Sequence, residues 1–412
     1  MCRCYLKKMQ TRGEIESSRV RRGKWRLWLA LVMLGCVLCC RADEEWEDLS
    51  RIPSESTPVR ELVTQTEMGS ISTIGGRLAT AGQDGNMYLW RWDALDNEPN
   101  KVTLDERLWR PFWDFTTFPL PDNRACTLLN EDRVVHVLHE RRGTSVVVTD
   151  ARSGSELKRW LVGDGWKCRE LRGTRNGKYI AGQFIRTGYS AGRDYGSHKL
   201  YVLKADANDL DCVLTISRER DGYLRDVAIS ECGRYVAVVG TCNAGFIIMA
   251  DTVAKKKLWE RMPKGEDLFY NSWTVNFNDV CFSPDSERVY VAGNIGLLCF
   301  DVATGKVTKE WPMPARVASV AVSHDGRLAA AGLMGCDYVY ICETRGANPV
   351  GQPILGLITG QKSMYGVAFS RDSALLATEG VLNTNIKIWK MPGPKGESTN
   401  EEIGPNEPPE RR

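Results

Sequence analysis

Two histidines three residues apart, His136 and His139, are the pair in this sequence with the clearest potential for metal chemistry. Imidazole nitrogens bind zinc, but a zinc site needs three or four ligands, and no carboxylate follows at ligand spacing. The surrounding residues, RVVHVLHE, are typical of a β-strand, in which side chains three positions apart face opposite sides. We therefore expect neither a metal site nor a cofactor.

Other catalytic signatures are missing from the sequence. It contains no GxSxG nucleophile elbow, no phosphate-binding loop and no HExxH helix. Acidic residues are plentiful, but no pattern selects two of them as an acid and a base. We assign no catalytic residue and expect a protein that is not an enzyme.

The cysteines indicate packing more than chemistry. Five of the 14 lie within residues 1–42, and the nine that remain include no CxxC pair. An odd number cannot all pair within one chain. Cys281 and Cys299 lie in apolar strand-like runs, where a thiol acts as a small core side chain. One or two disulfides stay open, but a disulfide scaffold is not expected.

Aromatic and arginine residues gather in three long segments that we expect to be loops: LDERLWRPFWDF (104–115), FIRTGYSAGRDYGSHK (184–199) and MPKGEDLFYNSW (262–273). Long loops on a rigid scaffold often carry recognition, and Trp, Tyr and Arg are common interface anchors. Trp113 and Trp273 are equally compatible with core packing at the start of a strand. The candidate binding residues are Trp109, Arg110, Arg186, Tyr189, Arg193, Tyr195, Phe269 and Tyr270.

The scaffold that would position these segments is visible as an internal repeat. An alternating apolar run, a polar turn and a second apolar run recur in VAISECGRYVAVVG (227–240), VCFSPDSERVYVAG (280–293), VASVAVSHDGRLAAAG (317–332) and VAFSRDSALLATEG (367–380). Aligned on the turn, seven copies follow one another at spacings of 39 to 56 residues. Four strands per unit of this length are typical of a β-propeller.

The stretch GQDGNMYLWR (82–91), with FSPDSERVYVAG and SHDGRLAAAG, resembles the WD-repeat family over residues 60–391. The resemblance implies an all-β fold, a seven-bladed β-propeller of four-stranded antiparallel blades. It also implies that RELVTQTE (60–67) supplies the outer strand of the last blade. Asp84 and Trp90 match the family's hydrogen-bonded network, but most units lack the Trp-Asp pair, and none of the four histidines follows a glycine. A related propeller family of YVTN type is compatible with the same architecture.

Charge is distributed unevenly along the chain. Residues 1–42 hold ten of the 55 basic and two of the 52 acidic residues, so this segment carries +8 and the remainder −5. An acidic body provides no electrostatic surface for nucleic acid. The sequence therefore excludes nucleic acid as an expected partner.

The N-terminal segment has the pattern of a targeting sequence. RRGKWR (21–26) precedes LWLALVMLGCVLCC (27–40), which is shorter than the roughly 20 residues that span a bilayer as a helix. We predict an apolar targeting helix in a signal peptide, with Cys40 and Ala42 at the −3 and −1 positions of the cleavage site. A membrane anchor at residues 27–40 and a lipoprotein modified at Cys36 are the alternatives.

These features predict the domain organisation. Residues 1–42 form the signal peptide or anchor, 43–59 a linker, 60–391 the propeller and 392–412 a disordered tail, because PGPKGESTNEEIGPNEPPERR has little apolar content.

We expect an exported, monomeric propeller that acts as a non-enzymatic scaffold and binds a protein partner. The alternative is an extracytoplasmic propeller enzyme, of hydrolase or lactonase type, with a site at the central channel. Carboxylates or histidines converging at the channel would favour the enzyme, and a broad aromatic surface would favour the scaffold.

Overall fold

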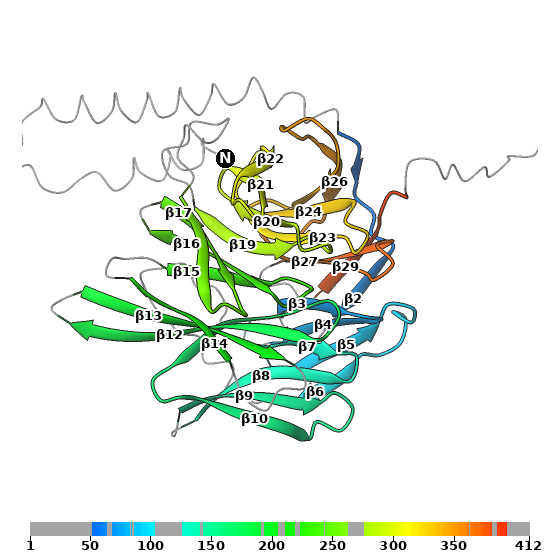
Figure 1. Ribbon diagram of the computed structural model, residues 1–412. Helices are drawn as coiled ribbons and strands as arrows, with labels where there is room; N and C mark the ends of the chain where they lie inside the picture. Colours follow the sequence, from blue (N-terminus) through cyan, green and yellow to red (C-terminus); the bar gives the residue numbers. More distant parts are fainter. Residues whose placement is uncertain are drawn as a thin grey trace, which may run out of the picture. The chain divides into compact units, whose positions relative to one another are not determined.

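The computed structural model describes residues 52–63, 68–82, 84, 86–103, 126–140, 143–190, 193–204, 211–218, 223–242, 244–262, 276–361, 363–380 and 385–393. Within these residues the strands form seven sheets, six of four strands and one of five (Figure 1). The inner strands of neighbouring sheets contact one another in a closed series. The expected seven-bladed β-propeller with four-stranded antiparallel blades is therefore confirmed.

The first three blades are each built from four consecutive strands. Blade 1 holds β3 (Met68–Ile74), β4 (Arg77–Gly82), β5 (Asn86–Arg91) and β6 (Asn100–Thr103). Blade 2 holds β7 (Cys126–Asn130), β8 (Arg133–Glu140), β9 (Gly143–Asp150) and β10 (Glu156–Gly163). Blade 3 holds β11 (Lys167–Gly173), β12 (Tyr179–Ser190), β13 (Arg193–Lys204) and β14 (Asp211–Arg218).

The other four blades continue in the same order. Blade 4 holds β15 (Tyr223–Ile229), β16 (Tyr235–Cys242), β17 (Ala244–Asp251) and β18 (Lys256–Arg261). Blade 5 holds β19 (Phe277–Phe282), β20 (Arg288–Gly293), β21 (Gly296–Asp301) and β22 (Val307–Trp311). Blade 6 holds β23 (Val317–Val322), β24 (Leu328–Leu333), β25 (Tyr338–Glu343) and β26 (Pro353–Ile358), and blade 7 holds β27 (Met364–Phe369), β28 (Leu375–Gly380) and β29 (Asn385–Lys390).

The N-terminal part of the propeller closes the ring. β2 (Arg60–Val63) pairs antiparallel with β29, so it supplies the outer strand of blade 7 as expected. β1 (Ser54–Glu55) lies in the segment that we expected to be a linker, and it pairs parallel with β26 as a fifth strand of blade 6. Two sheet edges that would otherwise be open templates for association are thus paired.

Stacking of the blades explains their burial pattern. The central strands are covered on both faces by neighbouring blades, so β24 is buried at every residue rather than at alternate ones. The outer strands show a mixed pattern, as in β10, where Trp160 is buried and Leu161 is exposed. Apolar clusters fill the spaces between adjacent blades, for example Trp259 of blade 4 with Phe300 of blade 5.

The repeated polar turn joins the first two strands of a blade. In blade 5, Ser283 Oγ accepts a hydrogen bond from the Arg288 amide at 3.0 Å, and Asp285 Oδ1 accepts one from the Glu287 amide at 3.0 Å. Ser370 and Asp372 of blade 7 repeat this arrangement. Ser286 and Ser373 adopt positive φ there, where Gly326 stands in blade 6. The turn is structural, as its composition predicts.

Residues 184–199 differ from the expected loop. Apart from residues 191 and 192, which lie outside the described residues, they belong to the long antiparallel strands β12 and β13, whose register runs from Tyr179 opposite Lys204 to Ser190 opposite Arg193. The glycines of this segment do not interrupt the pairing, because Gly188 and Gly196 both have partners across the ladder. The part expected to be an irregular loop is an extended β-hairpin.

Two predictions on the chain ends lie outside the described residues: the targeting helix within residues 1–42, and most of the disordered tail, residues 394–412. Over the ranges that the structure does describe, there is no helix of the length and apolar character needed to cross a membrane.

Candidate functional site

The central channel holds a cavity of about 140 Å³. Residues of the inner strands of blades 1, 2, 3, 5, 6 and 7 line it. Most are small or apolar, but Arg172 and Arg175 of blade 3 and His324 of blade 6 also face it. The channel cavity is therefore lined mainly by apolar side chains, with three charged or titratable side chains among them. This makes it the first candidate site.

Arg172 is at the centre of an acidic cluster. Its Nε lies 3.3 Å from Glu170 Oε1 and 3.3 Å from Asp226 Oδ1, and its Nη2 lies 3.3 Å from Asp279 Oδ1. The three carboxylate side chains are only 2%, 0% and 6% exposed. Burial lowers the pKa of Arg172, but the charges of Asp226, Glu170 and Asp279 outweigh it and hold that pKa well above its usual value.

The cluster connects blade 3, which holds Arg172 and Glu170, with blades 4, 5 and 6. Asp226 Oδ2 of blade 4 accepts a hydrogen bond from the Val280 amide of blade 5 at 3.0 Å. Asp279 Oδ2 of blade 5 accepts one from the Val320 amide of blade 6 at 2.8 Å. Carboxylates that accept backbone hydrogen bonds and face an arginine are stabilised in the ionised form. Arg172 and the backbone amides of Val280 and Val320 are the donors, so much of the bonding capacity of Asp226 and Asp279 is used within the fold.

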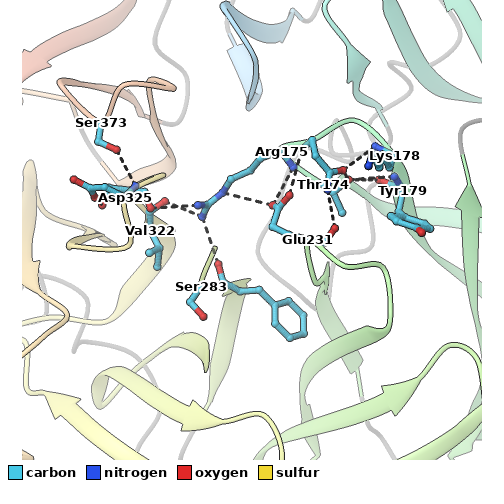
Figure 2. Close-up of polar contacts among 12 residues, drawn as sticks. Thr174, Arg175, Lys178, Tyr179, Glu231, Ser283, Val322, Asp325 and Ser373 are labelled. Atoms are coloured by element: carbon cyan, nitrogen blue, oxygen red, sulfur yellow. Dashed lines mark hydrogen bonds and ion pairs between the residues drawn. The ribbon is translucent and has the colours of Figure 1, made fainter. Parts of the chain in front are cut away.

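Arg175 spans the channel at the end where β11 turns toward β12 (Figure 2). Its Nη2 donates to the Val322 carbonyl at 2.8 Å and its Nη1 to the Ser323 carbonyl at 3.2 Å. Its Nε lies 3.8 Å from Glu231 Oε1, which also accepts from the Arg175 amide at 3.0 Å. The Arg175 side chain of blade 3 therefore contacts both blade 4 and blade 6 across the channel.

The remaining titratable groups of the channel are held neutral. Burial lowers the pKa of His324 to about 4, with the charges of Arg175 and Arg371 acting in the same direction. Burial raises the pKa of the Cys126 thiol to about 12, and burial also raises that of Cys281. Neither thiol is an activated nucleophile, since the thiolate is the reactive form.

The described cysteines form no disulfide, and the first histidine of the predicted pair packs in the core. Eight cysteines are free thiols, so the disulfides left open above do not form among them: Cys126, Cys168, Cys212, Cys232, Cys281, Cys299, Cys336 and Cys342. His136 is buried, and its Nε2 lies 2.9 Å from Thr149 Oγ1. The His, Cys, Asp and Glu side chains that the structure describes form no group of three suited to a metal ion.

The second candidate site is the β12–β13 hairpin, which carries four of the eight predicted binding residues. Arg186 is exposed on β12, and its guanidinium lies close to Gly165 in the turn before β11. Tyr189 is on β12, directly opposite Asp194, while Arg193 and Tyr195 are on β13. The hairpin therefore brings these four positions together on two paired strands.

The other four predicted residues, Trp109, Arg110, Phe269 and Tyr270, lie outside the described residues, as do Trp113 and Trp273. Of the three aromatic segments that were expected to form the binding face, the structure therefore describes mainly the one in blade 3.

Sequence reasoning missed the channel cluster, although a signal for it exists. Glu170, Asp226 and Asp279 each stand four residues before the Thr or Ser that opens the turn of their blade. Two positions after that acidic residue, blades 4 and 5 have Ala228 and Cys281, whereas blade 3 has Arg172. A charged residue at a position that is otherwise small and apolar indicates a buried ion pair.

No protein-family model matches this chain, and no curated protein matches it. Among solved structures it is similar to a chain of the "Crystal Structure of Mitotic Checkpoint Complex", with a TM-score of 0.57 and 13% sequence identity, over 82% of this chain and 92% of that one. At this identity the likeness shows the fold alone. Because 1287 chains of solved structures match, the architecture does not select a function.

Proposed function

We propose that this protein is a non-enzymatic β-propeller scaffold that binds another protein outside the cytoplasm. The observation that carries the proposal is the contrast between the two candidate sites. The charged groups of the channel are paired with one another, whereas the β12–β13 hairpin continues beyond both neighbouring strands and carries exposed Arg186. Groups already satisfied within the fold offer little to a ligand, and exposed arginine with tyrosine is typical of interfaces.

The test is a variant in which Arg186, Tyr189, Arg193 and Tyr195 are all replaced by alanine. We expect it to fold and to lose partners that the wild-type protein retains in a pull-down from the native compartment. Recovery of the same partners by wild type and variant would contradict this placement of the interaction face.

A matched control shows whether any loss is local to the hairpin. Four exposed aliphatic side chains lie on or beside the outer strands of blades 2 and 4 and do not belong to the hairpin: Leu157, Leu161, Leu258 and Met262. Their fourfold alanine variant should recover the wild-type partners. Loss of partners in both variants would indicate a general effect on the propeller.

Export rests on the N-terminal sequence. Cleavage after Ala42 would leave Asp43 as the first residue of the mature protein. N-terminal sequencing of protein isolated from its host measures this directly, and an intact Met1 or Met9 would contradict cleavage. A membrane-anchored protein would remain with the membrane fraction after a carbonate wash.

The second candidate function is an enzyme acting in the channel. The observation that favours it is the convergence of Glu170, Asp226 and Asp279 beside Arg172, with His324 facing the same cavity. Removal of the acid or base of such an enzyme typically costs orders of magnitude in turnover. If Asp279→Asn abolished an activity found by screening ester, lactone and glycoside substrates, the scaffold proposal would fail.

A further inference from the structure

The β12–β13 hairpin has an open edge. β11 pairs with β12 only as far as Lys167 opposite Ile185, and β14 pairs with β13 only as far as Arg218 opposite Gly196. Residues 186–190 of β12 are paired with β13 on one side, and among the described residues no strand lies on their other side. The free edge of β12, residues 186–190, is therefore a template for another strand.

The alternation of the ladder identifies the backbone groups on this edge. Ser190 pairs with Arg193 across only two intervening residues, and in a two-residue hairpin the last pair of the ladder is a hydrogen-bonded one. In an antiparallel ladder, alternate residues bond to the partner strand. Thr187 and Tyr189 consequently direct their N–H and C=O groups away from β13, toward the open edge.

The same propeller already accepts strands from distant parts of the chain at its blade edges. β2 pairs with β29 across more than 300 residues of sequence, and the Pro53 carbonyl before β1 accepts a hydrogen bond from the Gly356 amide of β26 at 2.9 Å. Those edges are filled from within the chain. The edge of β12 also presents backbone N–H and C=O groups, but among the described residues no strand pairs with it.

Charge indicates what the edge would accept. Residues 184–199 contain Arg186, Arg193 and Lys199 against Asp194, a net charge of +2, whereas the chain beyond residue 42 carries −5. Exposed Lys167 stands where β11 begins, beside the end of the open edge. Like charges disfavour a second copy of this edge, and an acidic segment is attracted to it.

We propose that the free edge of β12 binds an extended acidic segment of a partner protein, which adds as a strand to blade 3. This inference rests on the proposed scaffold function and names the chemistry of the partner. Main-chain hydrogen bonds from Thr187 and Tyr189 supply the affinity, and the basic residues around them select for Asp and Glu.

The experiment uses a random twelve-residue peptide library displayed on phage and selected against the propeller. We expect enrichment of Asp- and Glu-rich peptides without proline. Thr187→Pro removes the outward N–H while sparing the bonds to β13, because proline is tolerated on an edge strand whose N–H faces solvent. This variant should weaken binding of the selected peptides at least tenfold, and the control Thr187→Val should leave it unchanged.

Three outcomes would overturn the inference: no enrichment of acidic peptides, equal peptide binding by Thr187→Pro and wild type, or a dimer seen by sedimentation that Thr187→Pro dissociates, which would make a second copy the occupant. Amide hydrogen exchange gives an independent readout, since bound peptide should slow exchange at Thr187 and Tyr189. If Thr187→Pro retains the native partners that the fourfold alanine variant loses, strand addition fails while the scaffold function stands.

Discussion

The two ends of blade 3 differ in how their polar groups are paired. Where β11 turns into β12, Arg172 and Arg175 contact groups from blades 4, 5 and 6, and buried carboxylates and carbonyls use up their donors. At the other end, β12 and β13 extend past β11 and β14, and backbone groups are left without partners among the described residues. Satisfied polar groups hold a ring together, and unsatisfied ones at a surface are suited to recognition.

Stability should therefore depend on the first end and binding on the second. Substitutions at the channel end and changes to the hairpin should therefore separate these two roles.

The largest effect should come from Arg172→Ala. It leaves Glu170, Asp226 and Asp279 buried close to one another without their cation, which should cost about 3–5 kcal/mol of unfolding free energy. Urea unfolding followed by tryptophan fluorescence measures the loss. Arg186→Ala, the same substitution at the exposed end, should change stability by less than about 0.5 kcal/mol. If Arg172→Ala and Arg186→Ala lowered the unfolding free energy equally, the two ends of blade 3 would not differ in their contribution to stability.

Arg175→Met should also lower the free energy of unfolding, but by less than Arg172→Ala does. Methionine keeps an unbranched apolar stem but cannot donate to the carbonyls of Val322 and Ser323, so we expect a loss of about 1–3 kcal/mol. Arg186→Met is the control for the change in stem. A melting temperature of Arg175→Met equal to that of wild type would show that the contact across the channel contributes nothing.

His324 makes stability at the channel end sensitive to pH. Its folded pKa of about 4 lies below the ordinary value of 6.5, so the unfolded chain binds the extra proton first. The contribution of neutral His324 to the free energy of unfolding is fully present above pH 6.5, and it declines as the pH falls toward 4. His324→Gln should reduce the difference between the urea midpoints at pH 7.5 and pH 5.0. An unchanged difference would exclude His324 as its source.

The smallest effect on stability should follow from shortening the hairpin. Joining Arg186 to Ser197, which are opposite each other in the ladder, through Asn-Gly replaces residues 187–196 with a favoured two-residue turn. Unfolding free energy should change by less than about 0.5 kcal/mol. The trimmed protein should nevertheless lose the peptides that the full hairpin binds. A large loss of stability would show that the hairpin end belongs to the structural core.

Much of the fold could be read from the chain because each blade repeats the same local chemistry. Alternating apolar runs around a Ser-Asp or Ser-Gly turn identify two strands of a blade without knowledge of the others. Seven copies then imply seven blades, and the closing strand at Arg60–Val63 was implied by the resemblance to the WD-repeat family. The fifth strand β1 has no such signal, since only two of its residues pair.

The hydrogen-bonded network was foreseen only in part. Within blade 1, the Asp84 carboxylate accepts hydrogen bonds from the Tyr88 hydroxyl at 2.6 Å and from the Asn86 amide at 3.2 Å. In blade 7, Trp389 Nε1 donates to Thr378 Oγ1 at 3.0 Å, and Thr378 Oγ1 donates to Gln361 at 3.1 Å. Gln361 follows Gly360 in the sequence, so a Gly-Gln pair precedes blade 7, whereas the WD-repeat family has a Gly-His pair.

The sequence by itself determined the repeated strands, their turns and hence the ring, because these depend on neighbours within a few residues. It also indicated that Arg186, Tyr189, Arg193 and Tyr195 belong together, although a run of Gly and Ser was mistaken for a loop. Only the tertiary structure decided that Arg172 meets Asp226 and Asp279, which lie 54 and 107 residues further along the chain. Ring closure brings such residues together, and no local pattern records which inner strands will share a channel.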